Sequence, residues 1–329
     1  MKLMVIIPAY NEQDTIAEVI DSIPKNIYRI DEIEILVVDD GSTDRTAEIA
    51  AAKGVSVISH RENKGLGIAF QTGVEEGLRR GADIVVNIDA DNQFDANEIC
   101  KLIDPILDRG VGMVAGTRFS DKESGEVVPW IKRWGNWFFS KLMSVLTGKH
   151  FSDTQCGFRA YSRDALLRLN LFGRFTYTQE VFLDLVNKGV EIEQVPVSVR
   201  YFKEREAKIS GSLLGYLLQA MIIIMRTFRD YKPLVFFGIP GVAVFGTGIL
   251  FLLYCLGYWF FYAKTSPIET YFNIGIASTI LGFLLIILAL IADMLKRMRR
   301  NQEELLYQLK KKEYEKIKNE DSQQQRPLL

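Results

Sequence analysis

The sequence of 329 residues carries 40 lysines and arginines against 41 aspartates and glutamates, which gives a formal net charge of -1. This length allows one large domain with accessory segments, and the near-neutral charge argues against a nucleic-acid binder with a broad basic face. The three cysteines, Cys100, Cys156 and Cys255, form no Cys-x-x-Cys pair. We therefore expect neither a disulfide framework nor a zinc site. Scattered cysteines of this kind are typical of buried thiols in a reducing compartment.

Strand-like and helix-like segments alternate through the first part of the chain. The predicted strands are residues 3–7, 33–38, 55–59, 84–88 and 112–115, and the predicted helices are 15–23, 44–52, 66–79 and 97–108. Asp44 and Asn97 are the expected N-caps of the second and fourth helices. The alternation predicts an α/β fold in which helices cover a mostly parallel sheet. Gly65 and Gly67 lack a third glycine at position 70, so a dinucleotide loop is not expected.

Three of the predicted strands end in polar, turn-forming residues. These ends are Pro8-Ala9-Tyr10-Asn11-Glu12, Val38-Asp39-Asp40-Gly41-Ser42 and Asp89-Ala90-Asp91. The carboxyl ends of parallel strands line one edge of an open sheet, where ligands bind. Two carboxylates one residue apart at a strand tip can hold a divalent cation together with two phosphates. A lone Asp-x-Asp is more often an acidic turn, but three such strand ends together favour a nucleotide-sugar site.

Taken in order, the three motifs resemble those of the inverting family-two glycosyltransferases over roughly residues 1–205. The resemblance is closest to dolichol-phosphate mannose synthases and polyprenyl-phosphate glycosyltransferases, and it implies a GT-A fold. It implies that Asp39 contacts the base of a GDP- or UDP-sugar, that Mg²⁺ or Mn²⁺ binds the diphosphate, and that Asp89, Asp91 and Gln93 hold the metal. The implied donor-binding set is Pro8, Tyr10, Glu12, Asp39, Asp89, Ala90, Asp91, Gln93 and Arg205.

The acceptor side follows the fifth predicted strand. Arg118 ends that strand, and residues 128–139 mix aromatic side chains with cations that include Arg133. Such a segment can lie at a bilayer surface or pack on the sheet as an ordinary amphipathic helix, and both interpretations stay open. Arg118 and Arg133 match basic positions that dolichol-phosphate mannose synthases use near the lipid phosphate. The planar guanidinium suits that role because it binds phosphate oxygens bidentately.

Residues 153–159, Asp-Thr-Gln-Cys-Gly-Phe-Arg, resemble the acceptor-side motif of the same family, which ends in Gly-Phe-Arg. The resemblance implies that Asp153 acts as a base or orients the acceptor. A phosphate monoester is already ionised near neutral pH, so it needs no strong base. Arg159 makes either a structural ion pair or a substrate contact.

A charged loop follows at residues 200–208, where related enzymes carry a basic loop that closes on the donor diphosphate. The chain departs from the family's Gly-x-Ser-Lys-like turn here, so the choice of Arg205 over Arg200 stays open. The chain also lacks the Gln-x-x-Arg-Trp motif of processive polysaccharide synthases, which favours the transfer of a single sugar.

Two later segments, Leu234–Tyr262 and residues 271–292, are essentially uncharged and long enough to cross a hydrocarbon core of about 30 Å. Lysines and arginines lie before the first segment and after the second, so the positive-inside rule predicts that the catalytic domain and both termini are cytosolic. We expect a GT-A domain at 1–210, an interfacial amphipathic helix at 211–232, a transmembrane hairpin at 233–292 and a charged tail at 293–329.

The sequence therefore predicts a membrane enzyme that moves one sugar from a nucleoside-diphosphate sugar to a polyprenyl phosphate, dolichyl or undecaprenyl, at the cytosolic face. Inversion at the sugar is implied by the resemblance. The expected catalytic residues are Asp91, Asp153, Arg118 and Arg133. The alternatives are transfer to another lipid or glycan acceptor and a non-catalytic nucleotide-sugar-binding membrane scaffold. We expect the bilayer but no nucleic acid as a partner, and homo-oligomerisation stays open.

Overall fold

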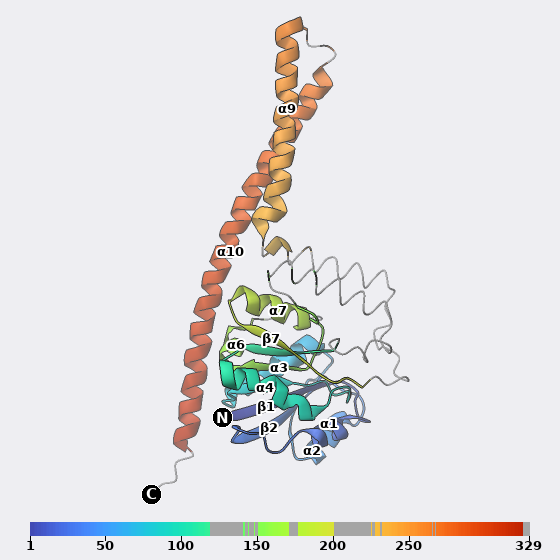
Figure 1. The fold of residues 1–329 in the computed structure, drawn as a ribbon, viewed down its shortest axis with the longest axis vertical. Helices are drawn as coiled ribbons and strands as arrows, with labels where there is room; N and C mark the ends of the chain where they lie inside the picture. The colour runs from blue at the N-terminus through green and yellow to red at the C-terminus, as the bar shows by residue number, and fades with distance from the viewer. Residues whose placement is uncertain are drawn as a thin grey trace. The chain divides into compact units, whose positions relative to one another are not determined.

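The structure is a computed structural model of the whole chain. It describes residues 1–118, 141, 144, 148, 151–170, 177–200, 225, 228–230, 232–264, 266 and 268–324. The chain divides into two compact units, one formed by Met1–Arg205 with Leu305–Leu329 and the other by Glu206–Glu304. The first unit contains the predicted sheet, and the second contains the two apolar segments (Figure 1).

Strands from the described part of the first unit form one seven-stranded sheet in the order β3-β2-β1-β4-β6-β5-β7. Their bounds are β1 (Lys2–Ala9), β2 (Glu32–Asp39), β3 (Ser56–Ser59), β4 (Ile84–Asn87), β5 (Met113–Thr117), β6 (Arg159–Ser162) and β7 (Ile192–Pro196). β6 runs antiparallel to β4 and β5, whereas the other pairs are parallel. The predicted α/β fold with a mostly parallel sheet is confirmed.

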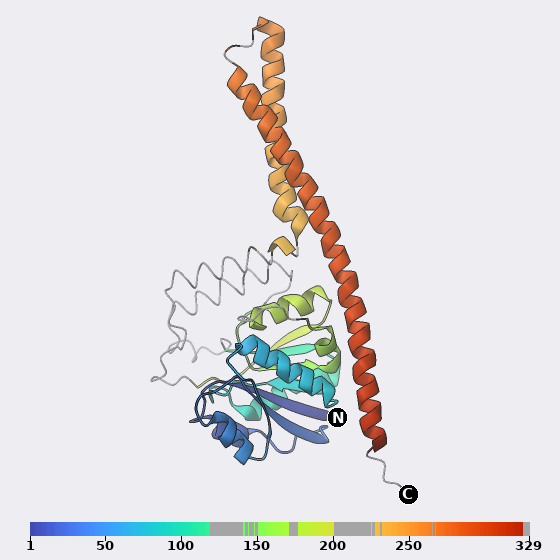
Figure 2. The ribbon, with the colours of Figure 1, turned by 180° about the vertical axis from the view of Figure 1, so that it is seen from behind.

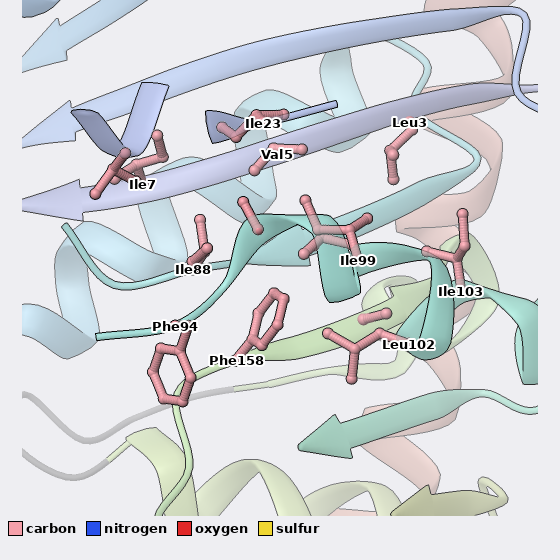
Figure 3. Packing of buried hydrophobic residues seen from close by; sticks show 14 of the residues in the cluster. Leu3, Val5, Ile7, Ile23, Ile88, Phe94, Ile99, Leu102, Ile103 and Phe158 are labelled. Atoms are coloured by element: carbon pink, nitrogen blue, oxygen red, sulfur yellow. The ribbon is translucent and has the colours of Figure 1, made fainter. Parts of the chain in front are cut away.

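Helices cover both faces of this sheet (Figures 1 and 2). They are α1 (Ile16–Ser22), α2 (Thr46–Ala52), α3 (Leu66–Arg79), the short η1 (Ala96–Glu98), α4 (Ile99–Arg109), α6 (Arg163–Arg168) and α7 (Tyr177–Asn187). Side chains of β1 alternate between the two faces, as the two-residue period of a strand requires. Leu3, Val5 and Ile7 join a core with residues of α1 and α4 (Figure 3), while Ile6 faces α3 at Gly73.

Neither of the two predicted helix caps is confirmed. The N-cap of α2 is Arg45 and not the predicted Asp44, but the Asp44 carboxylate still accepts a hydrogen bond from the Thr46 backbone N–H at 3.0 Å in the first turn. The prediction for Asn97 is wrong as well. Asp95 caps the η1 turn instead, because its carboxylate accepts a hydrogen bond from the Asn97 N–H at 3.0 Å and the helical turn begins one residue before Asn97.

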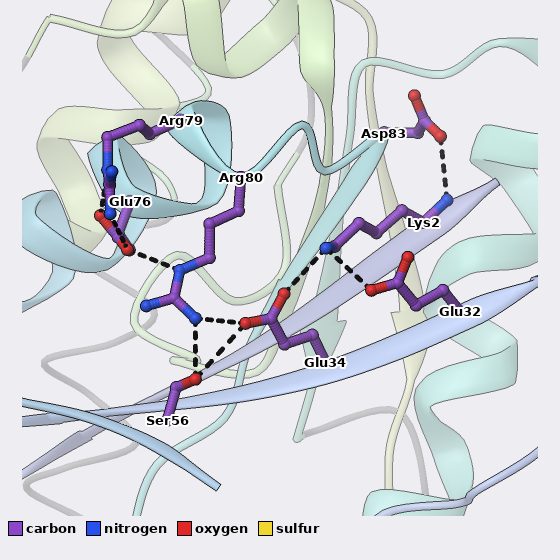
Figure 4. Close-up of polar contacts among 8 residues, drawn as sticks. All are labelled: Lys2, Glu32, Glu34, Ser56, Glu76, Arg79, Arg80 and Asp83. Carbon is purple, nitrogen blue, oxygen red and sulfur yellow. Dashed lines mark hydrogen bonds and ion pairs between the residues drawn. The ribbon is translucent and has the colours of Figure 1, made fainter. Parts of the chain in front are cut away.

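Ion pairs hold the amino-terminal edge of the sheet (Figure 4). Glu34 of β2 pairs with the Lys2 ammonium at 2.9 Å and with the Arg80 guanidinium. Burial would raise the pKa of Glu34, but the hydrogen bonds from these two cations outweigh it and hold the pKa below its ordinary value. Arg80 also bonds Ser56 of β3 at 2.7 Å, so this network connects neighbouring strands.

The second unit contains a π-helical turn, η3 (Leu234–Gly238), followed by α9 (Ile239–Tyr262) and the first part of α10 (Glu269–Gln324). By length and composition, the helical stretches Leu234–Tyr262 and Glu269–Ile317 are candidate membrane spans. The two helices approach closely at glycines. A Cβ on Gly248 would lie 2.5 Å from the Thr279 backbone nitrogen, and one on Gly282 would lie 2.3 Å from that of Phe245. Small residues at such points are typical of packed membrane helices.

The last part of α10, from Leu305, belongs to the first unit. Its Tyr307 side chain is buried, and the Tyr307 hydroxyl donates a hydrogen bond to the Asp164 carboxylate of α6 at 2.6 Å. The Arg168 guanidinium lies 4.2 Å from the centre of the Tyr307 ring, and the Lys310 ammonium donates to the Leu169 carbonyl at 3.0 Å. This part of the tail therefore packs along α6.

Candidate active site

The strand order gathers the three sequence motifs at one edge of the sheet. β1 lies between β2 and β4, so the carboxyl ends that carry Asp39, Tyr10 and Asp89 are neighbours. The chain passes from β1 to β2 and β3 on one side and then returns past β1 to β4 on the other side. Such a reversal of strand order opens a crevice for ligands in α/β folds. The predicted convergence of the strand ends is confirmed by this topology.

The turn after β1 is connected to the turn after β2. Asn11 adopts a left-handed conformation with φ of 54°, which asparagine tolerates better than most residues. Its backbone N–H donates to the Ser42 hydroxyl at 2.9 Å, and its side-chain oxygen accepts from the Thr43 N–H at 2.8 Å. The Glu12 N–H donates to the Thr46 hydroxyl at 2.8 Å. These bonds fix one turn against the other.

The predicted base-side residues differ in their exposure. Pro8 is buried inside β1 and pairs with Val38, whereas Tyr10 is 40% exposed. Asp39 is buried, and its carboxylate accepts the Ser42 N–H at 3.1 Å. Glu12 is half-buried and accepts a hydrogen bond from the Thr15 hydroxyl at 3.1 Å.

Sequence reasoning missed the role of Asp40. Its buried carboxylate lies 2.7 Å from Nδ1 of His60 and accepts the backbone N–H groups of Lys64 at 3.0 Å and Gly65 at 2.8 Å. Asp40 thus holds the loop that leads into α3. Adjacent residues of a strand point to opposite faces, so the Asp39-Asp40 pair in the sequence already indicated two separate roles.

The Asp89-Ala90-Asp91 turn is fixed from several sides. The Ala90 carbonyl accepts the Thr15 hydroxyl at 2.8 Å, and the Asp91 carboxylate accepts the Gln93 N–H at 3.1 Å. Asn92 takes a left-handed conformation with φ of 58°, which turns the chain away from β4. The Gln93 carbonyl accepts the Arg200 N–H at 2.9 Å, which brings the chain after β7 to this turn.

Asp89 and Asp91 form a carboxylate pair with an unusual electrostatic environment. Burial raises the pKa of Asp89 to about 7, and the negative charge of Asp91 adds to the effect. The positive charges of Arg118 and Arg159 act in the opposite direction. A divalent cation beside the pair would compensate the excess negative charge.

The donor chemistry of this pair fits Mg²⁺ or Mn²⁺. Both cations prefer oxygen ligands, and Mg²⁺ is commonly bound by one or two carboxylates together with substrate phosphates. Within the described ranges, no group of three or more His, Cys, Asp or Glu side chains could hold a metal ion. The pair would therefore hold the ion with the substrate supplying further oxygens.

On the acceptor side, the structure brings together two predicted residues. Asp153 is fully buried, and its carboxylate accepts hydrogen bonds from Nε of Arg118 at 2.7 Å and from Nη2 at 3.1 Å. The backbone N–H groups of Arg118 and Gln155 donate to the same carboxylate at 3.3 and 3.0 Å. The ion pair is therefore bidentate and leaves Arg118 partly exposed.

Arg159 contacts backbone carbonyls and an aromatic ring. Its side chain is fully buried, and the guanidinium donates to the backbone carbonyls of Cys156 at 2.6 Å, Thr178 at 2.8 Å and Thr154 at 2.9 Å. It also lies 4.7 Å from the centre of the Phe182 ring. Arg159 thus connects the 153–159 segment to α7.

A comparison with known proteins shows the family to which this chain belongs. Residues 4–169, about half of the chain, match Glycosyl transferase family 2. The chain belongs to glycosyl transferase family 2. It is an enzyme of that class, and the resemblance noted from the three strand ends is confirmed.

Two relatives of this glycosyltransferase carry names that mention a lipid phosphate or its prenol. The polyprenol monophosphomannose synthase of Mycolicibacterium smegmatis is 32% identical over 228 residues, which cover 64% of this chain and 82% of the relative. The UDP-N-acetylglucosamine–dolichyl-phosphate N-acetylglucosaminyltransferase of Methanococcus voltae is 29% identical over 244 residues, which cover 68% of this chain and 96% of the relative.

A solved structure resembles the same part of the glycosyltransferase. It is glucosyl-3-phosphoglycerate synthase from Mycobacterium tuberculosis in complex with Mn²⁺, uridine diphosphate and phosphoglyceric acid. The TM-score is 0.51 at 26% sequence identity, and the match covers 70% of this chain and 78% of the other. The GT-A fold is confirmed.

The described part of the glycosyltransferase thus contains most of the predicted site. The donor-side residues lie on the ends of β1, β2 and β4, and Arg118 and Asp153 pair beside the end of β5. Arg133 and Arg205 lie outside the described residues, as do most of residues 211–232, for which an interfacial helix was predicted.

Proposed function

We propose that this glycosyltransferase moves one sugar from a nucleoside-diphosphate sugar to a polyprenyl phosphate at the cytosolic membrane surface, with inversion at the sugar. The observation that carries the proposal is the bidentate Asp153–Arg118 pair, which directs a partly exposed guanidinium toward the edge that holds Asp89 and Asp91. A fixed cation beside the carboxylate pair suits an anionic acceptor. The names of the two relatives and the two candidate membrane spans support a lipid-linked acceptor.

The chemistry follows from the two halves of the site. The acceptor phosphate oxygen attacks the anomeric carbon, a new carbon–oxygen bond forms, and the bond to the donor diphosphate breaks. The electron pair of that bond leaves with the nucleoside diphosphate. Asp89 and Asp91, with Gln93, would hold Mg²⁺ or Mn²⁺, which would neutralise charge on the leaving diphosphate. Tyr10, Glu12 and Asp39 would bind the base and ribose.

Arg118 supplies the charge that the acceptor needs. A phosphate monoester carries most of its second negative charge at neutral pH, since its second pKa is about 6. Its attacking oxygen therefore needs no proton acceptor. Arg118 would bind the other phosphate oxygens and orient the attacking oxygen toward the sugar. Arg133 and Arg205 are proposed to assist at the acceptor phosphate and the donor diphosphate.

The first test is a direct search for the lipid product. Purified full-length protein in detergent is incubated with a mixture of UDP- and GDP-sugars and with polyprenyl phosphate, free polyprenol or diacylglycerol, and the lipids are analysed by mass spectrometry. We expect one hexose or N-acetylhexosamine on polyprenyl phosphate, with no product in excess chelator. Equal transfer to polyprenol or diacylglycerol would favour another lipid acceptor, and no transfer to any lipid would favour a glycan acceptor.

A second test concerns the orientation in the membrane. Cations before α9 and after the apolar part of α10 support a cytosolic position for both flanks, with the connecting loop outside. In intact cells, a cysteine introduced at Ser266 is expected to react with an impermeant reagent, whereas one at Ser322 should react only after permeabilisation. Labelling in the reverse order would place the active site on the other side.

A further inference from the structure

The segment formed by residues 153–159 is almost entirely buried. Asp153, Thr154, Cys156, Phe158 and Arg159 each have 0% exposure, and Gly157 is buried as well. Only Gln155 is partly exposed. Residues that contact a substrate directly must be reachable, so most of this segment acts on neighbouring protein groups.

One neighbour is Asp89. A Cβ built on Gly157 would lie 2.5 Å from Oδ2 and 2.7 Å from Oδ1 of Asp89, and the third nearest atom is Cγ of the same side chain. Gly157 is not among the residues with positive φ, so its backbone does not require glycine. The requirement is steric, because the Asp89 carboxylate occupies the space that any side chain at 157 would fill.

The other neighbour is Arg118. The Asp153 carboxylate accepts hydrogen bonds from Nε of Arg118 at 2.7 Å and from Nη2 at 3.1 Å. It also accepts the backbone N–H of Arg118 at 3.3 Å. A bidentate pair with both partners fixed in this way sets the plane of the guanidinium. These contacts of Asp153 fix the orientation of the Arg118 side chain.

Several contacts give the segment a defined shape. Arg159 binds its carbonyls at Thr154 and Cys156. Asn87, two residues before Asp89, donates from its side chain to the Gly157 carbonyl at 2.9 Å. On the core side, the rings of Phe94 and Phe158 pack with centroids 5.3 Å apart, which connects the turn after Asp91 to the residue after Gly157 (Figure 3).

We propose that residues 153–159 are a shared positioning element, in which Gly157 fixes the place of the Asp89 carboxylate and Asp153 fixes the orientation of Arg118. The inference about Arg118 rests on the proposed function, whereas the contact between Gly157 and Asp89 does not. The segment couples the metal-binding side of the site to the acceptor side. Asp153 is a positioning residue and does not serve as the base.

The contact at Gly157 is tested by a double-mutant cycle that needs no nucleotide and no lipid. Unfolding temperatures are measured in chelator for full-length Gly157→Ala, Asp89→Ala and the double variant. Gly157→Ala alone is expected to lower the unfolding temperature by about 3 °C or more, but by less than about 1 °C in the Asp89→Ala background, because the colliding carboxylate is gone. Equal losses in the two backgrounds would overturn the proposal for Gly157.

Gly112→Ala provides a matched control. A Cβ at Gly112 would lie 2.2 Å from the Val190 side chain, with no atom of Asp89 among its nearest neighbours. It is expected to destabilise the protein equally with and without Asp89. Should Gly157→Ala fail to fold in the wild-type background, recovery of a folded double variant supports the same conclusion, and failure of both rejects it.

Asp153→Asn tests the second half of the proposal through steady-state kinetics and pH dependence. Asparagine keeps the shape but weakens the hold on Arg118, so the KM for polyprenyl phosphate is expected to rise about tenfold, with kcat and the pH profile preserved. A general base would behave differently, since its removal lowers kcat about a hundredfold or more and deletes one limb of the pH profile. The second result would overturn the assignment of Asp153 while leaving the proposed reaction intact.

Discussion

Asp91→Asn is expected to reduce sugar transfer at saturating Mg²⁺ or Mn²⁺ by about a hundredfold or more, with little change in the unfolding temperature. The residue supplies one of the two carboxylates of the Asp89-Ala90-Asp91 turn, and a catalytic cation contributes several kcal/mol of charge stabilisation to the leaving diphosphate. Asp95→Asn is the matched control. Asp95 follows in the same loop but caps η1, and asparagine caps a helical turn about as well as aspartate, so Asp95→Asn is expected to change neither the stability nor the metal response noticeably.

The carboxylate pair can also be tested through protein stability. Replacing the Asp89 carboxylate by a neutral amide should stabilise the metal-free protein. The pKa of Asp89 rises from 3.8 to about 7 on folding. Between these values the folded state binds a proton that the unfolded state has released, so stability falls as the pH rises through this window. Above pH 7 the full cost is present, on the order of 4 kcal/mol. Asp89→Asn removes this cost because the amide carries no charge.

In chelator, Asp89→Asn should therefore unfold at a higher temperature than the wild type at pH 8, and the difference should shrink toward pH 4. With Mn²⁺ the difference should narrow, because only the wild type gains stability from binding the ion. Thermal unfolding of the full chain at several pH values measures both effects. A stabilisation by Asp89→Asn that does not depend on pH would argue against the carboxylate pair as the metal site. So would an equal change of the unfolding temperature in the wild type and in Asp89→Asn when Mn²⁺ replaces chelator.

The donor side could be predicted from sequence because its information is local. The runs before Tyr10, Asp40 and Asp89 are apolar and β-branched, and each stops in turn-forming polar residues, so strand and site are read from the same few positions. The predicted strands at 3–7 and 33–38 lie within β1 and β2. Parallel strands then bring the three ends together whatever the length of the connections.

The acceptor side depended on strands that the sequence did not reveal. β6 contains Arg159 and Ser162, and β7 reads Ile-Glu-Gln-Val-Pro at an edge of the sheet, so neither has an apolar run. The insertion of antiparallel β6 between β4 and β5 brings Asp153 to Arg118, 35 positions earlier in the chain. The sequence left the role of Asp153 open because a buried ion pair and a base use the same residue type.

The ion pair also changes how the acceptor site must be tested. Arg118→Ala would leave the fully buried Asp153 carboxylate without its guanidinium partner, and breaking a buried pair in this way costs about 3–5 kcal/mol. Lost transfer in that variant could reflect unfolding alone. Arg118→Lys keeps the charge, and Arg118→Ala/Asp153→Asn removes both charges together. These two variants separate phosphate binding from stability.

Arg118→Lys is expected to raise the KM for polyprenyl phosphate about tenfold, because a point charge cannot bind both Asp153 and phosphate with the geometry of a planar fork. The double variant should fold, bind nucleotide with wild-type affinity by calorimetry, and lose acceptor use by about 10- to 150-fold, the equivalent of one charge-assisted contact of about 1.5–3 kcal/mol. Arg109→Ala is the control, since its exposed pair with Glu193 on β7 is remote from the proposed chemistry. If the double variant transfers normally, or if nucleotide affinity falls in the same proportion as transfer, Arg118 does not bind the acceptor phosphate. A neutral lipid or a glycan then becomes the better acceptor, because the pairing of Arg118 with Asp153 would serve the structure alone.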